Sequence, residues 1–348
     1  GNGVVKYFTT FSNTIYDVLS SRGWKEVEAD DDWDFVWADR EWVYSAFDKM
    51  HLEQWQKLNH YRNGRELCRK DLVAKNIKRQ RRQLEKEGRT EEASQYDILP
   101  TTFLLPREYA MFVEEFKKIG GIWIMKPIGA AQGKGIFLFT RLSEISDWKT
   151  DFKYKPGGGS EKEVEAYVCQ RYLQYPLCIG GKKFDIRMYA LVTSFSPLKV
   201  YIYRRGFARF TNSRYSSRME DIYDEFMHLT NVAIQKTADN YDERTGGKME
   251  LQALKLHIMS KYGQERTDAL FWEIQMIVLR SLLAVQQVMI HDKHCFELYG
   301  YDIIIDADLR PWLLEVNASP SLTANTNEDY AMKTAMLHGM LDIIDMDK

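Results

Sequence analysis

The sequence predicts an α+β fold, because apolar runs typical of antiparallel strands alternate with helical patterns along the chain. Three observations support this prediction. Two apolar runs at residues 301–305 and 312–316 flank a group of turn residues, as in a β-hairpin. Residues 122–139 read as a strand, a glycine-rich loop and a second strand. Residues 107–118 place their apolar side chains on one helical stripe.

The composition is that of a globular protein with sizeable cores. The 348 residues are 45% hydrophobic and 28% charged, which allows two or three domains. A net charge of −2 predicts no general attraction to nucleic acid. The four cysteines are dispersed without a CxxC pair, which argues against a zinc ribbon or a disulfide framework and favours an intracellular protein. The longest apolar segment, residues 269–290, carries charged and polar side chains, so we expect no membrane span.

The first 67 residues predict short strands and helices with a tryptophan-rich core, and residues 33–38 read as one of these strands. Residues 64–88 predict one long charged helix with few apolar positions. Residues 64–89 hold ten basic residues against four acidic ones, and residues 199–218 hold six basic residues and no acid. Such runs are usually solvated faces, but two of them in a nearly neutral chain indicate a local site for an acidic peptide or another polyanion.

The helix expected at residues 107–118 packs on a sheet through its apolar stripe, and the strand that follows ends at Lys126. The period-two alternation places Lys126 at the lip of the glycine-rich loop. Gly129 and Gly133 leave backbone amides free to approach phosphates, and Lys134 adds positive charge. The loop is not a P-loop, because its spacing differs and a strand follows it in place of a helix.

Residues 155–163 predict a surface loop, and residues 167–173 predict a strand that leads into the last part of the chain. The next strand alternates so that Lys183, Asp185 and Arg187 share one face. A solvated strand face can carry such charges. The same alternation of basic, acidic and basic groups is also how a sheet presents a nucleotide and a carboxylate substrate.

The C-terminal hairpin predicts a metal site. If Asp306 pairs with Pro311 across the turn, Asp302 lies opposite Glu315, and the alternation places Asn317 on the same face. Opposed carboxylates about 5 Å apart repel each other unless a cation lies between them. Three oxygen ligands at this spacing suit Mg²⁺, which also binds nucleotide phosphates. The alternative is an edge hairpin with solvent-facing acids, which explains one carboxylate better than three aligned ligands.

Together these features resemble the ATP-grasp fold, in which a nucleotide lies between two α+β lobes, and more narrowly the tubulin tyrosine ligase-like family. The segments that carry the resemblance occur in the family's order: RKDLVAKNIKR, WIMKP, GKGI, QRYL, KFDIR, HLTNVAIQK, ELYGYDIIID and WLLEVNASPSL. They cover nearly the whole chain. The segments FVEEFKK, HLTNVAIQKT and DKHCFELYGYDIIID are most similar to compact members that act as polyglutamylases of ciliary tubulin.

The resemblance implies a small N-terminal α/β domain at residues 1–68, a central lobe with the glycine-rich flap at residues 69–171, and a C-terminal lobe with the metal-binding hairpin at residues 172–348. One departure is Ala130, where close relatives often carry a basic residue in the flap. This departure concerns the affinity of the flap for the nucleotide and leaves the implied chemistry unchanged.

The resemblance also implies a role for each matching residue. Mg²⁺ would be bound by Asp302, Glu315 and Asn317, while Arg187 and Arg209 would face the reacting carboxylates. The residues implied to bind ATP are Lys70, Lys126, Gly133, Lys134, Gln170, Tyr172, Lys183, Asp185, Thr230 and Asn231.

The implied activity is an ATP-dependent ligation that adds L-glutamate to γ-carboxylates of glutamates in the acidic C-terminal tail of tubulin, through an acylphosphate. The implied location is the cytoplasm and its cytoskeleton, at the axoneme or basal body of a cilium or flagellum. Larger relatives bind microtubules through a cationic C-terminal segment, and this chain ends soon after SPSL. We therefore expect a helper or targeting protein.

Three alternatives stay open on the sequence. The first is the same ligase chemistry with glycine or tyrosine, or with an acidic acceptor other than tubulin. The second is a non-catalytic subunit of an axonemal or microtubule complex. The third is an ATP-dependent ligase of small carboxylates, which is supported by fold analogy alone.

Overall fold

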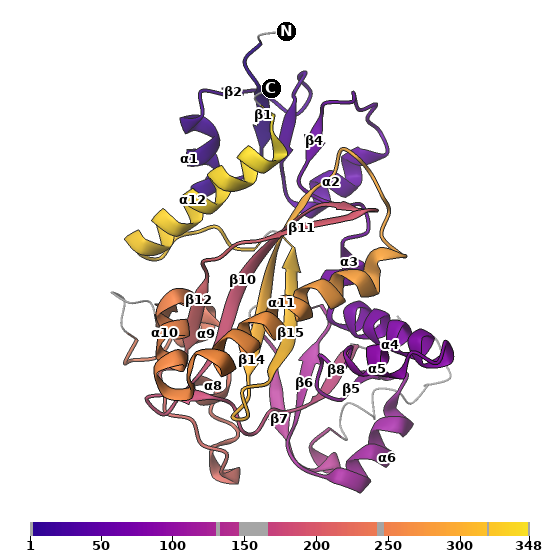
Figure 1. Cartoon of the computed structure of the whole chain (residues 1–348), viewed down its shortest axis with the longest axis vertical. Coiled ribbons are helices and arrows are strands. Elements are labelled where there is room, and N and C mark those ends of the chain that lie inside the picture. The colour runs from indigo at the N-terminus through magenta and orange to yellow at the C-terminus, as the bar shows by residue number, and fades with distance from the viewer. Residues whose placement is uncertain (1–2, 130–132, 146–165, 242–246, 319, 347–348) are drawn as a thin grey trace, which may run out of the picture.

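The computed structural model describes residues 3–129, 133–145, 166–241, 247–318 and 320–346. The expectations for Ala130 and for the loop at residues 155–163 lie outside these ranges. The described chain forms three sheets with helices packed on their faces, which confirms the predicted α+β class (Figure 1). Within the described residues, no helix has both the length and the apolar character needed to cross a bilayer.

The N-terminal sheet is parallel, with the strand order β2-β1-β3-β4. Its helices begin at side-chain caps, because Asn13 and Asp39 accept hydrogen bonds from backbone N–H groups of the first helical turns. The predicted tryptophan core is confirmed here, since Trp33 and Trp37 are buried. The elements of this part are β1 (Lys6–Thr9), α1 (Thr14–Ser21), β2 (Lys25–Glu26), β3 (Phe35–Trp37), α2 (Arg40–Phe47) and β4 (Lys57–Leu58).

The long charged helix predicted at residues 64–88 is interrupted. Arg69 has an extended conformation with ψ 127°, so the segment forms α3 (Arg65–Cys68) and α4 (Lys70–Lys86), and α5 (Thr90–Ser94) follows. Because of this break, Lys70 begins a new helix, and its ammonium group lies 3.6 Å from the carboxylate of Glu315. The prediction of one continuous helix was wrong at the residue where the chain turns toward the site.

The second sheet is antiparallel, with the order β5-β8-β6-β7. The apolar stripe of α6 (Tyr109–Ile119) packs on it, and Phe112 at the centre of that stripe contacts Trp123 and Phe139. This confirms the predicted amphipathic helix. The strands are β5 (Thr102–Leu105), β6 (Trp123–Pro127), β7 (Phe137–Phe139) and β8 (Tyr167–Arg171).

The largest sheet has seven strands, and α11 crosses its front face in Figure 1. Its main order is β13-β12-β10-β14-β15, and β9 and β11 also pair with β10. The strands are β9 (Cys178–Ile179), β10 (Lys182–Phe195), β11 (Leu198–Ile202), β12 (Phe207–Phe210), β13 (Lys248–Glu250), β14 (Glu297–Ile305) and β15 (Pro311–Ala318). The helices are α8 (Glu225–His228), α9 (Val232–Gln235), α10 (Leu251–Tyr262), α11 (Gln264–Gln286) and α12 (Asn327–Ile344).

The C-terminal helix α12 returns to the N-terminal part and lies beside α1 (Figure 1). Apolar side chains of both helices share one core with β1, β3 and the upper part of β10, and Leu337 of α12 is fully buried in it. The hydroxyl of Thr14 donates a buried hydrogen bond of 2.5 Å to the backbone carbonyl of Leu322, just before α12. The start and the end of the chain therefore form one packed unit against the large sheet.

The register of the C-terminal hairpin differs from the prediction by one residue near its turn. Ile305, and not Asp306, pairs with Pro311. Continued without interruption, this register would place Asp302 opposite Leu314. The register instead shifts after Ile303, so that Leu314 is an extra residue and Asp302 lies opposite Glu315. The predicted carboxylate pair is confirmed, but a β-bulge produces it.

Candidate active site

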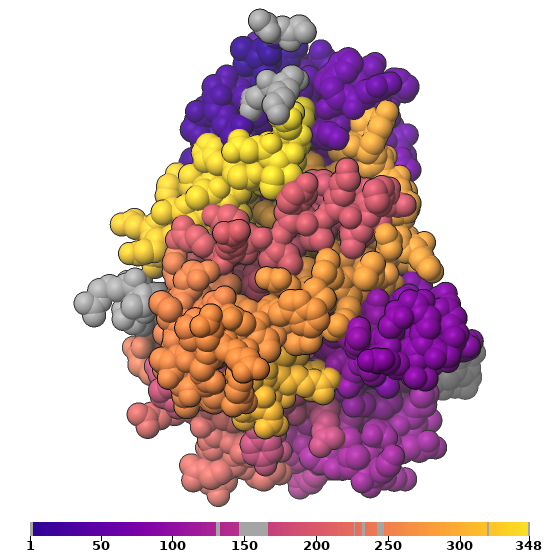
Figure 2. All heavy atoms as spheres, viewed as in Figure 1, coloured from indigo at the N-terminus to yellow at the C-terminus, as the bar shows by residue number. Residues whose placement is uncertain are grey.

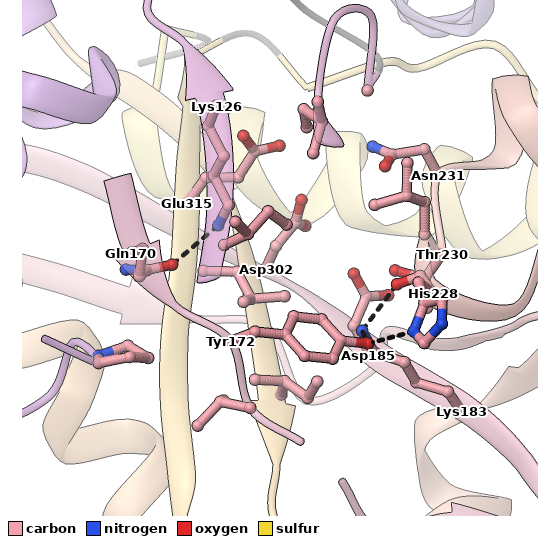
Figure 3. A pocket seen from close by; sticks show the side chains of 18 of the residues that line it. Lys126, Gln170, Tyr172, Lys183, Asp185, His228, Thr230, Asn231, Asp302 and Glu315 are labelled. Atoms are coloured by element: carbon pink, nitrogen blue, oxygen red, sulfur yellow. Dashed lines mark hydrogen bonds between the residues drawn. The ribbon is translucent and has the colours of Figure 1, made fainter. Parts of the chain in front are cut away.

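The candidate site is a cleft between the antiparallel sheet of β5–β8 and the seven-stranded sheet, drawn in Figure 3. Its volume is about 800 Å³, part of which is open to solvent. Eleven of the residues singled out from the sequence line it: Lys70, Lys126, Gly133, Gln170, Tyr172, Lys183, Asp185, Thr230, Asn231, Asp302 and Glu315. They come from segments far apart in the sequence, so the fold is what brings them together.

A carboxylate pair lies on the wall formed by β14 and β15. Asp302 is bound by two guanidinium groups: Arg187 Nε is 2.5 Å and Arg209 Nη2 is 3.1 Å from its Oδ1. Burial alone would raise the pKa of Asp302, but Arg187 and Arg209 outweigh it and hold that pKa well below its usual range. Burial, together with the charge of Asp302, raises the pKa of Glu315. The two guanidinium groups thus keep Asp302 ionised, and the negative charge of Asp302 disfavours ionisation of Glu315.

The donor chemistry of this pair suits Mg²⁺. Among the described residues, no group of three or more His, Cys, Asp or Glu side chains is arranged to hold a metal. The third oxygen would therefore come from the amide of Asn317. Its Nδ2 now donates to the carbonyl of Gly300 at 3.3 Å and lies 3.4 Å from Asp302 Oδ2, so the amide would have to turn for Oδ1 to bind a metal. Two carboxylates and an amide are hard oxygen ligands, and a cation between them would relieve the repulsion that raises the pKa of Glu315. The assignment of these three residues to a metal stays a prediction.

Two lysines line the cleft from different sheets: Lys126, half-buried on β6, and Lys183, buried on β10, which belongs to the same sheet as the two carboxylates. Lys126 of β6 donates a hydrogen bond of 2.9 Å to Gln170 Oε1 of β8 (Figure 3). Burial lowers the pKa of Lys126 to about 8 and that of Lys183 to about 7. Burial disfavours the charged forms of both lysines, so an anion bound in the cleft would stabilise their ammonium groups.

His228 is a residue of the site that sequence reasoning did not select. Its Nε2 lies 2.8 Å from the backbone carbonyl of Asp221, which can only accept, so Nε2 carries the proton and Nδ1 accepts from the hydroxyl of Tyr172 at 2.7 Å. Lys183 Nζ in turn donates to the Tyr172 oxygen at 3.1 Å and to the His228 backbone carbonyl at 2.7 Å (Figure 3). Burial lowers the pKa of His228, which favours this neutral ring. The only sequence signal was its place in HLTN, two residues before Thr230.

A second pocket of about 1520 Å³ lies beside the first, and Glu315 and Asn231 line both. Arg187, Arg209 and Asn317 line the second pocket. Its other cationic lining residues are Arg40, Lys236, Lys248 and Lys333. The two pockets therefore meet at Glu315 and Asn231, and cationic side chains predominate among the charged groups that line the second one.

The flap is described only in part. Gly133 has φ 79°, and a Cβ there would lie 2.5 Å from the side chain of Ile234, so only glycine fits against α9. Lys134, which sequence reasoning placed at the nucleotide, is exposed and lines neither of the two pockets. Its role at the phosphates stays a prediction.

Comparisons with known proteins agree over nearly the whole chain. Residues 48–348 match the model described as "Tubulin-tyrosine ligase family". The chain is 48% identical over 370 residues to "Probable tubulin polyglutamylase TTLL9" of Bos taurus, covering 99% of this chain and 80% of that protein. It is 47% identical to "Probable tubulin polyglutamylase ttll-9" of Caenorhabditis elegans, covering 97% and 79%. It is 43% identical to "Probable alpha-tubulin polyglutamylase Ttll1" of Tetrahymena thermophila, covering 98% and 86%.

Proposed function

The chain belongs to the tubulin-tyrosine ligase family, and we propose that it is an ATP-dependent tubulin polyglutamylase that adds L-glutamate to the γ-carboxylates of glutamates in the acidic tubulin tail. ATP occupies the first pocket. The acceptor carboxylate and the incoming amino acid occupy the second. Asp302, Glu315 and Asn317 would hold Mg²⁺ where the two pockets meet.

One observation carries this proposal: the two pockets share Glu315 and Asn231. A triphosphate in the first pocket then points its terminal phosphate toward the junction. A carboxylate in the second pocket approaches the same point between Arg187 and Arg209. The reaction needs several anions side by side, and cationic groups buried in a preorganised site stabilise such an arrangement best.

The chemistry follows from this arrangement. An oxygen of the acceptor γ-carboxylate attacks the γ-phosphorus of ATP, ADP leaves, and an acylphosphate forms. The amine of the incoming amino acid then attacks the acyl carbon, phosphate leaves with the bonding electrons, and the nitrogen loses a proton as the isopeptide bond forms. Arg187 and Arg209 hold the carboxylate oxygens, and Lys126 and Lys183 hold phosphate oxygens. Mg²⁺, when bound, supplies charge neutralisation at the phosphates.

The acceptor is proposed to be a flexible acidic peptide that binds weakly without help. Much of the basic character of α4 is used inside the protein, since Lys78 pairs with Glu108 at 3.0 Å and Arg79 donates to the carbonyl of Ala284. Lys75, Arg82 and Lys86 are exposed on α4, which lies against α11 on the surface in Figure 2. Arg81 and Arg89 are exposed as well but pair with Glu85 and Glu92, so the net positive charge of this surface is smaller than the count of basic residues suggests. We therefore propose that a helper protein assists binding to microtubules, and that the enzyme acts in the cytoplasm at the axoneme or basal body of a cilium or flagellum.

The test offers the protein microtubules, ATP, Mg²⁺ and an equal mixture of glutamate, glycine and tyrosine, and reads the masses of the tubulin tails. Glutamate addition is expected with the wild-type chain. The Glu315→Gln variant and a reaction containing a chelator in place of Mg²⁺ should both lose it. Glu328→Gln is the matched control, because Glu328 is exposed on α12 and lines neither of these pockets.

The same assay separates the alternatives. Transfer of glycine or tyrosine in place of glutamate would contradict the amino acid and keep the ligase chemistry. Hydrolysis of ATP without any tail modification, in the presence of microtubules, would contradict tubulin as the acceptor. Full activity of the Glu315→Gln variant would contradict the metal site.

A further inference from the structure

A buried ionic cluster lies on the α12 side of the second pocket, away from the carboxylate pair. The carboxylate of Asp329 is fully buried, and two ammonium groups share it. Lys248 of β13 lies 3.0 Å from its Oδ2, and Lys333, one helical turn further along α12, lies 3.1 Å from its Oδ1. Both lysines line the pocket.

The two lysines differ in the donors that remain available. Lys333 donates to Asp329 and also to the backbone carbonyl of Thr323 at 2.9 Å, which directs it toward the loop before α12. Lys248 donates to Asp329, and its ammonium group lies 4.9 Å from the ring centroid of Phe207. An ammonium group has three hydrogens, so Lys248 can also donate into the pocket. Arg187 and Arg209 bind Asp302 and Asp185 through Nε and Nη2, so the acceptor carboxylate would be held by their remaining N–H groups.

Asp329 is held from several directions. Its Oδ2 accepts from the backbone N–H of Asn325 at 3.0 Å, and its own N–H donates to the hydroxyl of Thr326, the N-cap of α12. Burial would raise the pKa of Asp329, but Lys333 and Lys248 outweigh it and lower that pKa. A fixed carboxylate of this kind determines where the ammonium group of Lys248 lies.

The charge count of the cluster points to a ligand. Two ammonium groups share one carboxylate, so the cluster carries an excess positive charge when both lysines are protonated. Burial opposes this state, because it lowers the pKa of Lys333 to about 8 and also lowers that of Lys248. A cluster that served stability alone would gain nothing from this excess, because an unbalanced buried charge is costly. A second carboxylate in the pocket would balance it.

We propose that Asp329 is a positioning residue, which holds Lys248 so that its ammonium group binds a carboxylate of the incoming amino acid. This inference rests on the proposed function, in which that amino acid occupies the second pocket. Asp329 itself does not touch the substrate. Its removal should therefore affect binding of the amino acid, and it should do so only through Lys248.

The test is a double-mutant cycle with Asp329→Asn and Lys248→Met, scored by the KM for the amino acid that the wild-type chain transfers and by the KM for ATP. Each single variant should raise the KM for the amino acid by about tenfold or more, because a buried charged hydrogen bond is lost. The KM for ATP should change by less than about twofold. In the Lys248→Met background, Asp329→Asn should add nothing further.

A second variant distinguishes an effect on amino-acid binding from misfolding. Asp329→Asn together with Lys333→Met removes one charge of each sign, so no additional unpaired charge is buried, and the KM for the amino acid should still rise. Asp329→Glu should restore part of the affinity. The inference would be overturned if Asp329→Asn lowered the unfolding temperature and left the KM for the amino acid unchanged. It would also be overturned if the effects of Asp329→Asn and Lys248→Met on that KM were additive. If the wild-type chain transfers an amino acid other than glutamate, the proposed function fails, and the cycle is scored with that amino acid.

Discussion

At the scale of single residues, the site is defined by charges that the protein leaves poorly compensated. Lys183 is buried and Lys126 is half-buried. Desolvation lowers the pKa of Lys126 to about 8 and that of Lys183 to about 7. Both values lie near physiological pH, so the charge of the empty cleft changes in the range where the enzyme works.

This leads to a prediction for the pH dependence of ATP binding. Phosphate groups favour the ammonium form, so binding raises both lysine pKa values and the complex holds more protons than the free protein. ATP affinity should therefore fall as the pH rises from about 6.5 to about 9, by at most about tenfold per pH unit for each lysine. Calorimetry in two buffers of different ionisation enthalpy should report proton uptake. Lys183→Met should reduce that uptake, and proton release on binding would contradict the prediction.

Local patterns identified residues whose polarity conflicts with their surroundings, and the family resemblance supplied the others. Asp302 and Glu315 stand in apolar strands, and Lys183, Asp185 and Arg187 alternate along a third. Such conflicts are visible in a sequence because a buried charge needs a partner. His228 was missed because its partners are a tyrosine 56 positions earlier and a backbone carbonyl. No local pattern records contacts of that kind.

At the scale of elements, the sequence predicted the amphipathic helix α6 and the hairpin of β14 and β15, because both have clear apolar periodicity. It did not predict the break at Arg69 or the bulge at Leu314. Arg69 and Leu314 are ordinary residues for a helix and a strand. The break and the bulge accompany the approach of Lys70 to Glu315, a contact between segments far apart in the sequence.

The N-cap of α12 gives a prediction at this scale. Thr326 accepts a hydrogen bond of 3.1 Å from the backbone N–H of Asp329. Thr326→Ala should lower the free energy of unfolding by about 1 kcal/mol, because one N–H in the first turn loses its acceptor. Urea denaturation measures this change. Thr326→Ser keeps the hydroxyl and should be close to the wild type, so an equal loss in both variants would show that the cap is unimportant.

At the scale of the whole molecule, α12 connects the second pocket to the N-terminal sheet. Lys333 and Asp329 on one side of the helix belong to the pocket region, and Leu337, one turn further on, is buried against the N-terminal core. The small N-terminal part therefore supports the pocket wall through this helix. Sequence reasoning placed the N-terminal and C-terminal parts in separate domains, and it contained no signal for this contact.

Leu337→Ala tests the connection. Loss of this fully buried side chain should lower the free energy of unfolding by about 2–5 kcal/mol, because a cavity remains in the shared core. The KM for the amino acid should rise more than the KM for ATP, since α12 borders only the second pocket. Thermal unfolding and steady-state kinetics measure the two effects.

The matched control is Leu283→Ala on α11, where the side chain is 39% exposed. The same substitution there should change stability by about 0.5 kcal/mol or less. Equal losses at both positions would contradict the special role of the shared core.

The distribution of the charged groups over the sheets has a consequence for movement. Arg187, Arg209, Asp302 and Glu315 stand on β10, β12, β14 and β15, which are neighbouring strands of one sheet. Lys126 and Gln170 stand on the other sheet. A hinge motion between the sheets would change the distances from Lys126 and Gln170 to the nucleotide. It would leave the spacing of Arg187, Arg209, Asp302 and Glu315 unchanged. The spacing of these four groups thus does not depend on how far the cleft opens.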